Sequence, residues 1–150
     1  NPLAPVARVL EIERESDRTS TLANRFPKAC IEARHEAVVE GDQKCELVLT
    51  PGAMESAMAS PNADEFEEIV AADQCSVYLY DGDIGPGGIY DGTAYLIVAN
   101  EADVNVGLIE SDDPTLVERL ETTFDQYREA STPLTVSTLE TDSESIQAES

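Results

Sequence analysis

Residues 75–110, CSVYLYDGDIGPGGIYDGTAYLIVANEADVNVGLIE, constrain the fold of this chain most strongly. Three runs in this stretch, residues 75–80, 93–99 and 104–109, are rich in Val, Ile, Leu and Tyr and are bounded by Gly, Asp, Asn and Pro. That pattern is typical of β-strands joined by turns. A glycine-rich loop separates the first two runs, and a short polar turn joins the last two into a predicted β-hairpin. We therefore predict a sheet built around this stretch, with any binding site near the glycine-rich loop.

The rest of the chain supplies helices and one more strand. Apolar residues that recur at i, i+3, i+4 and i+7 indicate helices, and Thr50, Asn62 and Asp113 are suited to their N-caps. In the first helix this spacing predicts an inner face that includes Val6 and Leu10. The predicted helices are residues 2–15, 26–40, 51–59, 63–72 and 114–130. Residues 44–49 (KCELVL) predict a strand, and the polar residues 15–24 predict a loop.

This order of elements predicts an α/β (α+β) single domain with a mixed sheet of about four strands flanked by helices. Because helices connect strands 44–49 and 75–80, we expect these two strands to pair in parallel, and the later strands to add as a meander. Three segments follow: residues 1–41 as an N-terminal helical linker or dimerisation segment, residues 42–131 as the α/β domain, and residues 132–150 as an acidic disordered tail.

The net charge of −22 is the strongest feature of the composition, and only two of the nine basic residues are Lys. Acidic residues spread along the whole chain predict a surface adapted to multimolar salt, where self-repulsion is screened. An acidic protein of ordinary cytoplasm is the alternative. Direct binding to nucleic acid is disfavoured in either case, because it needs clustered Lys and Arg.

No apolar run approaches the roughly 18–20 residues that span a bilayer, and the first residues show no basic segment followed by an apolar core. We therefore predict a cytoplasmic domain without membrane contact. Since the chain begins at Asn1 instead of Met, we also expect it to be a fragment of a longer protein.

The three cysteines and the single histidine give no metal or disulfide pattern. Without a CxxC pair, neither a zinc knuckle nor a disulfide framework is predicted. Cys30, Cys45 and Cys75 are expected to be small buried residues, with a redox-sensing thiol as the alternative. His35, between Arg34 and Glu36, is expected on the solvated side of its helix.

The loop sequence DGDIGPGGIYDG is the candidate site. It lacks the spacing of a twelve-residue calcium loop, and it lacks the GxxxxGK[ST] pattern of a phosphate-binding loop. No metal and no cofactor are predicted. Two interpretations stay open: a solvated turn that uses the conformations of Gly and Asp, or a loop that contacts a ligand. The candidate ligand-binding residues are Tyr80, Asp81, Asp83, Tyr90 and Asp91.

Three runs of sequence carry a resemblance to a known family: ELVLTPGAMESAM, VYLYDGDIGPGGIYDGTAYLIVANE and GLIESDDPTLVERLETTFDQYREAS. In order and spacing they resemble the C-terminal regulatory domain of haloarchaeal winged-helix transcription regulators. That domain is similar to TrmB-type regulators and to the middle domain of methanogenesis regulators, whose fold is related to phospholipase D. The resemblance covers roughly residues 42–131 and, more loosely, the two N-terminal helices. In that family the DNA-binding winged helix precedes this domain.

Active phospholipase-D relatives carry an H-x-K-x₄-D motif. If Asp91 takes the Asp position, the Lys position falls on Pro86 and the His position on Ile84, and neither residue can do that chemistry. The resemblance therefore implies a regulatory domain that binds and does not react.

The resemblance implies a ligand-sensing and dimerising domain of an archaeal regulator, with an unidentified small-molecule effector, a homodimeric partner, and DNA bound only through an N-terminal domain outside this chain. Two alternatives belong to other classes. One is a pure dimerisation scaffold without a ligand. The other is a hydrolase of unrecognised type, for which Asp81, Asp83 and Asp91 are the only clustered carboxylates in the loop.

Overall fold

The computed structural model describes residues 4–99 and 105–139 of the chain. A seven-stranded mixed sheet in the order β6-β5-β4-β1-β2-β3-β7 forms its centre. The strands are β1 (Arg18–Ala23), β2 (Lys44–Leu49), β3 (Cys75–Leu79), β4 (Gly87–Tyr90), β5 (Thr93–Ala99), β6 (Asn105–Ser111) and β7 (Thr132–Leu134). The helices are α1 (Ala4–Glu15), α2 (Lys28–Val38), α3 (Pro51–Ala59), α4 (Ala63–Ala71) and α5 (Pro114–Glu129).

Strand direction follows from the connections. β1 pairs in parallel with β2, and β2 in parallel with β3, because α2 and then α3 and α4 carry the chain back across the sheet. The four remaining strand pairs are antiparallel. The parallel pairing of residues 44–49 with residues 75–79 is confirmed, and so is the hairpin of β5 and β6. The predicted turn at residues 101–103 lies outside the described residues.

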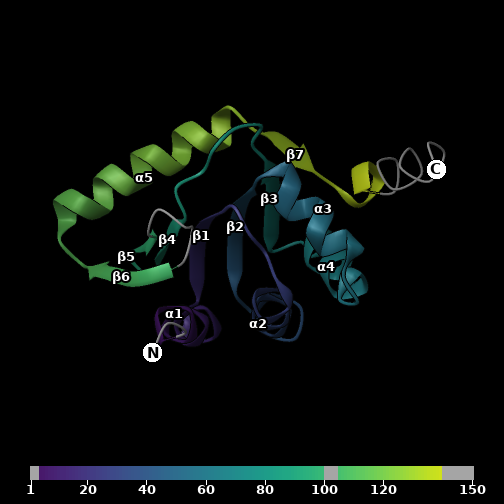
Figure 1. Cartoon of the computed structure of the whole chain (residues 1–150), viewed down its shortest axis with the longest axis horizontal. Coiled ribbons are helices and arrows are strands. Elements are labelled where there is room, and N and C mark those ends of the chain that lie inside the picture. The colour runs from purple at the N-terminus through teal and green to yellow at the C-terminus, as the bar shows by residue number, and fades with distance from the viewer. Residues whose placement is uncertain (1–3, 100–104, 140–150) are drawn as a thin grey trace.

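The two faces of the sheet are covered differently. Helices α1 to α4 lie on one face and α5 crosses the other, as Figure 1 shows with α5 above the strands and α1 and α2 below them. Side chains alternate between the faces along each strand. In β3, for example, Val77 packs with α2 and α4, whereas Tyr78 packs against the α5 side.

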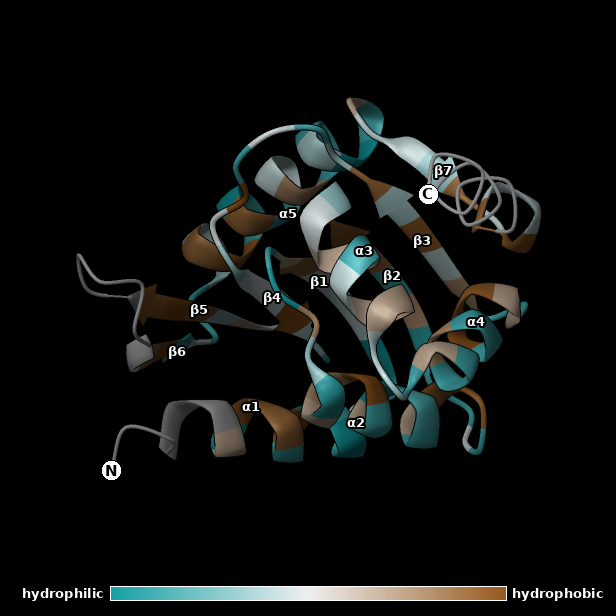
Figure 2. Ribbon diagram, turned by 45° about the vertical axis from the view of Figure 1, so that its right-hand side comes forward, coloured by the Kyte–Doolittle hydropathy of each residue, from teal (hydrophilic) through white to brown (hydrophobic). Residues whose placement is uncertain are grey.

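The main core lies under α2, α3 and α4. It is formed by aliphatic and aromatic side chains that are almost free of solvent, among them Ile31, Leu47, Phe66 and Ile69. Phe26 packs edge-on against Phe66, with ring centroids 5.9 Å apart. A smaller cluster joins α1 to β4 and β5, and Figure 2 shows the hydrophobic stretches of α1 and β5 that contribute to it.

The prediction of about four strands was wrong, because the sheet has seven. Residues 15–24, predicted as a loop, contain β1, which lies between β4 and β2. The glycine-rich loop contains β4, and the hairpin of β5 and β6 joins the sheet through β4 and β1. The later strands therefore do not extend from β3 as a meander.

The predicted segments also need correction. Because β1 is central to the sheet, the described residues 4–41 of the first segment belong to the same fold and are not only a helical linker. The first part of the predicted acidic tail is folded, since β7 pairs with β3 and Leu134 and Leu139 are buried in the main core. Residues 140–150 lie outside the described residues.

Helix starts match the expected capping in two of three cases. The Thr50 side chain accepts a hydrogen bond from the Ala53 backbone at 3.2 Å, and Asp113 accepts one from Thr115 at 2.8 Å. Asn62 makes no cap hydrogen bond to the backbone. Its amide instead donates to the Glu65 carboxylate at 2.7 Å.

The inner face of α1 differs from the predicted one. The helix buries Val9, Ile12, Glu13 and Ser16, which share the i, i+3, i+4, i+7 spacing, while Leu10 is half-buried. A carboxylate is thus part of the buried face. In residues 4–99 and 105–139, no helix has both the length and the apolar character needed to cross a membrane.

Candidate ligand site

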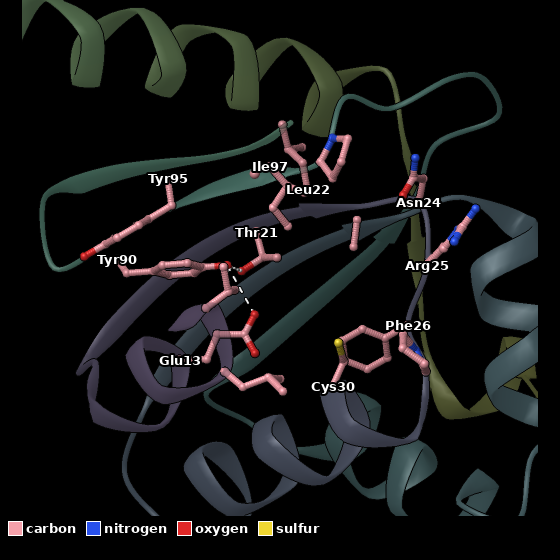
Figure 3. A pocket seen from close by; sticks show the side chains of 16 residues that line it. Glu13, Thr21, Leu22, Asn24, Arg25, Phe26, Cys30, Tyr90, Tyr95 and Ile97 are labelled. Atoms are coloured by element: carbon pink, nitrogen blue, oxygen red, sulfur yellow. Dashed lines mark hydrogen bonds between the residues drawn. The ribbon is translucent and has the colours of Figure 1, made fainter. Parts of the chain in front are cut away.

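A cavity of about 260 Å³ lies between α1 and the sheet, on the face opposite α5. Figure 3 shows its lining seen from close by. Its walls come from α1, from the end of β1 and the connection to α2, and from β4 and β5. The lining residues are Val9, Leu10, Glu13, Thr21, Leu22, Ala23, Asn24, Arg25, Phe26, Pro27, Cys30, Pro86, Gly87, Tyr90, Tyr95 and Ile97.

Local structure explains why these residues meet. Val9 and Glu13 lie one turn apart on α1, so both face the sheet. Tyr95 and Ile97 are two positions apart on β5, so both point to the α1 side. The apolar walls exclude water from most of the surface, whereas the exposed residues Asn24 and Arg25 are at the mouth.

Two glycines of β4 allow close approach of the neighbouring strands, and Gly88 also makes room for the phenol ring of Tyr90. A Cβ at Gly88 would lie 2.7 Å from the Ser20 carbonyl oxygen and 2.9 Å from the Tyr90 ring. A Cβ at Gly87 would lie 2.6 Å from the Tyr95 carbonyl oxygen. The glycine-rich sequence is therefore required for close strand pairing and for a tyrosine that lies along the sheet.

The Tyr90 hydroxyl reaches two polar groups beneath α1. It donates to Glu13 Oε1 at 3.3 Å and accepts from Thr21 Oγ1 at 3.3 Å. Figure 3 shows the Glu13 carboxylate, Thr21 and Tyr90 gathered on one side of the cavity. The tyrosine thus links the helix to two strands.

Glu13 forms a buried ion pair with Arg34 of α2. Arg34 Nη2 lies 3.0 Å from Glu13 Oε1, and the two side chains are 0% and 6% exposed. The guanidinium also donates to the Thr19 and Thr21 hydroxyls at 2.6 and 3.1 Å, to Gln43 Oε1 at 3.2 Å and to Cys45 Sγ at 3.3 Å.

Gln43 fixes the end of α1 through its side-chain amide, which donates to the backbone carbonyls of Glu13 and Ser16. The same side chain accepts from Arg34. The C-terminus of α1, the start of β2 and the guanidinium are therefore joined in one buried hydrogen-bond network.

The ionisation states in this network follow from burial and charge. Burial alone would lower the pKa of Arg34, but the neighbouring Cys45 and Glu13 outweigh it, so the pKa lies above its usual value. Burial, and then the Glu13 charge, raise the pKa of Tyr90. Arg34 is thus a cation and Tyr90 a neutral donor at neutral pH. Burial raises the pKa of Cys30, at the cavity wall, to about 12.

One carboxylate oxygen of this network has no partner. Glu13 Oε2 is buried and makes no hydrogen bond to any residue in the described part of the chain. Buried polar atoms are nearly always hydrogen-bonded, and leaving one without a partner costs about 1–3 kcal/mol, more for a charged group. Glu13 lines the cavity, so a group bound there could supply the missing donor.

The structure separates the five residues proposed from sequence. Tyr90 lines the cavity, whereas Tyr80 lies on the opposite face, where its ring packs edge-on against Tyr127 of α5 with centroids 4.8 Å apart. Asp81 and Asp83 are exposed in the connection from β3 to β4. Of the five, only Tyr90 lines the cavity.

Asp91 has a structural contact instead. Its carboxylate accepts backbone hydrogen bonds from Asp17 and Arg18 at 3.0–3.2 Å, which ties the turn between β4 and β5 to the start of β1. Asp91 itself has a φ of 50° and is followed by Gly92 with a φ of 83°. Left-handed conformations at two successive turn residues suit Asp-Gly.

The cysteines and the histidine carry no metal site. No group of three or more His, Cys, Asp and Glu residues within 4–99 and 105–139 could hold an ion. Cys45 and Cys75 are buried as predicted, and Cys30 is half-buried. The solvated position predicted for His35 was wrong, since its side chain is only 12% exposed and pairs with Glu68 of α4.

Sequence reasoning missed the two central residues of the site, Glu13 and Arg34. Neither was predicted to be buried or to belong to a site, because charged side chains are rarely fully buried. The usable signal was that Glu13 shares its spacing with Val9, Ile12 and Ser16.

A second hollow, of about 340 Å³, lies at the start of the parallel strands. It is lined by polar residues of both charges, including Arg18, Lys44, Glu46 and Asp73. It offers neither apolar walls nor an unpartnered buried group in its lining, so the cavity under α1 is the stronger candidate.

Residues 2–130 match the sequence profile described as "Methanogenesis regulatory protein FilR1, middle domain". The chain belongs to the FilR1 middle-domain family. The matched region includes α1 and β1, so the cavity lies entirely within it. The domain of a regulatory protein expected from the sequence is thereby confirmed. A search of curated protein sequences gave no match.

Solved structures show the same fold at low identity. The archaeal chromatin protein TrmBL2, described as showing a novel mode of DNA binding, is 15% identical, with a TM-score of 0.65 over 89% of this chain and 52% of that chain. The FilR1-type domain thus spans about half of TrmBL2. The phospholipase D family member Nuc from Salmonella typhimurium is 12% identical, with a TM-score of 0.65 over 87% of this chain and 90% of that one. NucT from Helicobacter pylori is 12% identical, with a TM-score of 0.63 over 89% and 92% of the two chains. The phospholipase-D-like fold is thereby confirmed.

Ile84 and Pro86, which the sequence analysis set against the His and Lys of the H-x-K-x₄-D motif, lie on different faces of the sheet in this FilR1-type domain. Ile84 is buried against Leu22, Val48 and Phe124 on the α5 face. Pro86 lines the cavity on the other face. If Asp91 takes the Asp position of the motif, an apolar residue and an imino acid stand where the reactive His and Lys would be.

Proposed function

We propose that this FilR1-type domain senses a small molecule, and that the effector binds in the cavity between α1 and the sheet. The observation that carries the proposal is Glu13 Oε2, a buried carboxylate oxygen at the wall of a largely apolar cavity that has no hydrogen-bond partner among residues 4–99 and 105–139. A few polar groups in an apolar pocket are typical of small-molecule sites. Tyr90, one of the residues proposed from the sequence, lies at that wall, and the loop with Asp81 and Asp83 leads to the cavity through Pro86.

The proposed signal is a shift of population at α1. Val9 and Ile12 pack on Tyr90 and Tyr95, and the Arg8 side chain forms an exposed ion pair with Glu110 at 2.9 Å. A ligand that fills the space beneath the helix favours one position of α1 over others. In regulators of the kind the sequence resembles, the DNA-binding winged helix precedes this domain, so α1 is the element that would pass the signal.

Binding, and not reaction, is the proposed chemistry. Ile84 and Pro86 provide neither a nucleophile nor a phosphate-binding cation. The Asp91 carboxylate is already occupied by the backbone of β1. We therefore expect no hydrolysis of bis(p-nitrophenyl) phosphate above the rate without protein.

The proposal is tested by blocking the cavity. Ile97→Trp adds volume at its wall, and Val39→Trp is the matched control, because Val39 is 37% exposed and does not line it. Thermal unfolding is followed against a panel of central metabolites in multimolar KCl. We expect at least one compound to give a saturable rise in Tm with the wild type and Val39→Trp but not with Ile97→Trp. A panel that stabilises none of the proteins, or all three equally, would contradict the proposal.

A second function, dimerisation, is favoured by exposed apolar side chains at one end of the sheet. Val98 of β5 and Ile109 of β6 are 40% and 48% exposed, and both lie on the α5 face beyond the helix. We propose that the domain forms a homodimer through this surface. Sedimentation equilibrium in multimolar KCl should show a dimer for the wild type and for Val39→Glu, and a monomer for Ile109→Glu. A monomeric wild type would contradict both the proposed homodimer and the alternative function as a pure dimerisation scaffold.

A further inference from the structure

The chemistry of the cavity narrows the class of effector. The walls are formed by aliphatic and aromatic side chains, among them Val9, Phe26, Tyr95 and Ile97. The volume of about 260 Å³ is far larger than one water needs, which is about 10–15 Å³. An apolar body of the size of a small ring therefore suits the space better than an ordered water alone.

The polar end of the ligand is defined by Glu13. Oε1 is occupied by Arg34 and by the Tyr90 hydroxyl, whereas Oε2 has no partner in the part of the chain that the structure describes. A carboxylate oxygen can only accept a hydrogen bond. The ligand must therefore present an O–H or N–H group to this oxygen.

The net charge of the ligand follows from the ion pair. Arg34 balances the charge of Glu13, and both side chains are almost entirely buried; Cys45, which contacts the same guanidinium through Sγ at 3.3 Å, is taken as a thiol. A cationic ligand would leave one buried positive charge in excess, and an anionic ligand would lie beside a carboxylate. The chain has a net charge of −22, but at multimolar salt surface charges act over only about 3 Å. The local balance therefore decides in favour of an uncharged ligand.

We infer that the cavity binds a small uncharged molecule with an apolar body and one hydroxyl or amide N–H group that donates to Glu13 Oε2. This inference rests on the proposed function, because it assigns the ligand class of the same cavity. It also gives the carboxylate a direct part in recognition. Glu13 favours binding of molecules that carry a hydrogen-bond donor over molecules of equal size that lack one.

Four probes of matched size test the inference: benzyl alcohol, toluene, benzylamine and benzoate. Binding to the ¹⁵N-labelled chain in multimolar KCl is measured from chemical-shift changes of residues around the cavity. We expect benzyl alcohol to bind about tenfold more tightly than toluene, and more tightly than either charged probe. Ile97→Trp should weaken benzyl alcohol binding, and Val39→Trp should leave it unchanged.

Two variants examine the acceptor directly. Tyr90→Phe removes a donor to Oε1 and leaves the carboxylate in place, so the preference for benzyl alcohol over toluene should persist. Glu13→Gln places an amide there, and the preference should fall to about twofold or less. If Glu13→Gln does not fold, the comparison of probes on the wild type still decides.

The outcomes separate this inference from the proposed function. Equal binding of toluene and benzyl alcohol, with loss of both in Ile97→Trp, would overturn the donor requirement while supporting the cavity as a site. Tightest binding by benzylamine or benzoate would overturn the assignment of an uncharged ligand. Binding of none of the four would overturn the inference, and the metabolite panel would then decide the proposed function by itself.

Discussion

On one face of the sheet, the half formed by β2 and β3 carries aliphatic side chains, whereas the half formed by β1, β4 and β5 carries hydroxyls, an ion pair and a cavity. Leu47 and Val77 of the first half pack under α2 to α4 without polar contacts. Thr19 and Thr21 of the second half accept hydrogen bonds from Arg34. We call these regions the apolar half and the polar half.

The difference between the halves indicates where stability and function lie. Aliphatic packing in the apolar half gains free energy from burial alone. In the polar half, a buried ion pair recovers its desolvation cost only if its hydrogen bonds are complete, and here Glu13 Oε2 and Arg34 Nε have no partner among the residues that the structure describes. A buried polar atom without a hydrogen-bond partner and without an evident structural gain is expected mainly at functional sites.

The largest expected loss of stability comes from breaking the ion pair of the polar half. Arg34→Met leaves the Glu13 carboxylate buried without a counter-charge, and the free energy of unfolding should fall by about 3–5 kcal/mol. Glu13→Leu combined with Arg34→Met removes both charges and should recover most of that loss. Urea unfolding in multimolar KCl measures both variants. If the double variant were no more stable than Arg34→Met, the charge argument would be wrong.

The next prediction compares the loss of stability when one side chain is truncated in each half. Leu47 is 0% exposed, so Leu47→Ala should lower the free energy of unfolding by about 2–5 kcal/mol. Ile97 is half-buried beside the cavity, and Ile97→Ala should cost only about 1 kcal/mol because little packing is lost. Equal costs at the two positions would show that the polar half is as tightly packed as the apolar half.

The smallest effect is a pH dependence that comes from the cavity wall. The pKa of Cys30 rises from its usual 9.0 to about 12 on folding, mainly through burial. Above pH 9 the unfolded chain therefore releases this proton first, so stability falls as pH rises from 9 toward 12. One pH unit above 9 the expected loss is about 1 kcal/mol. Unfolding measured at pH 8 and pH 10 should show a smaller loss in Cys30→Ala than in the wild type; an identical loss in both proteins would contradict the assignment.

The elements of the apolar half could be predicted from the sequence because their periodicity is that of their own secondary structure. β2 (Lys44–Leu49) was predicted with its bounds, and on the opposite face of the sheet α5 was predicted from its capping residue Asp113. β1 could not be predicted, since Thr19 and Thr21 look like loop residues until Arg34 is placed beneath them. The short strand β4 was hidden by its glycines, which contribute no side-chain pattern.

The site was predictable only in part, for a similar reason. Tyr90 was proposed because it lies in the glycine-rich loop between two predicted strands, beside an Asp-Gly pair. Tyr80, two positions beyond Tyr78, points to the opposite face, which alternation along β3 would have shown once β1 was known to lie in the sheet. The contact of Glu13 with Arg34 joins two helices, and neither helix pattern alone implies it.

The central claim is that a ligand bound in the cavity favours one position of α1 and so stabilises this helix. It is tested most directly by hydrogen exchange of backbone amides with and without benzyl alcohol, at a concentration that saturates its chemical-shift changes. The account predicts slower exchange in α1 (Ala4–Glu15) and no change in α3 (Pro51–Ala59), because α1 lines the cavity and α3 contributes no residue to its lining. Unchanged exchange in α1, or an equal slowing in both helices, would contradict it.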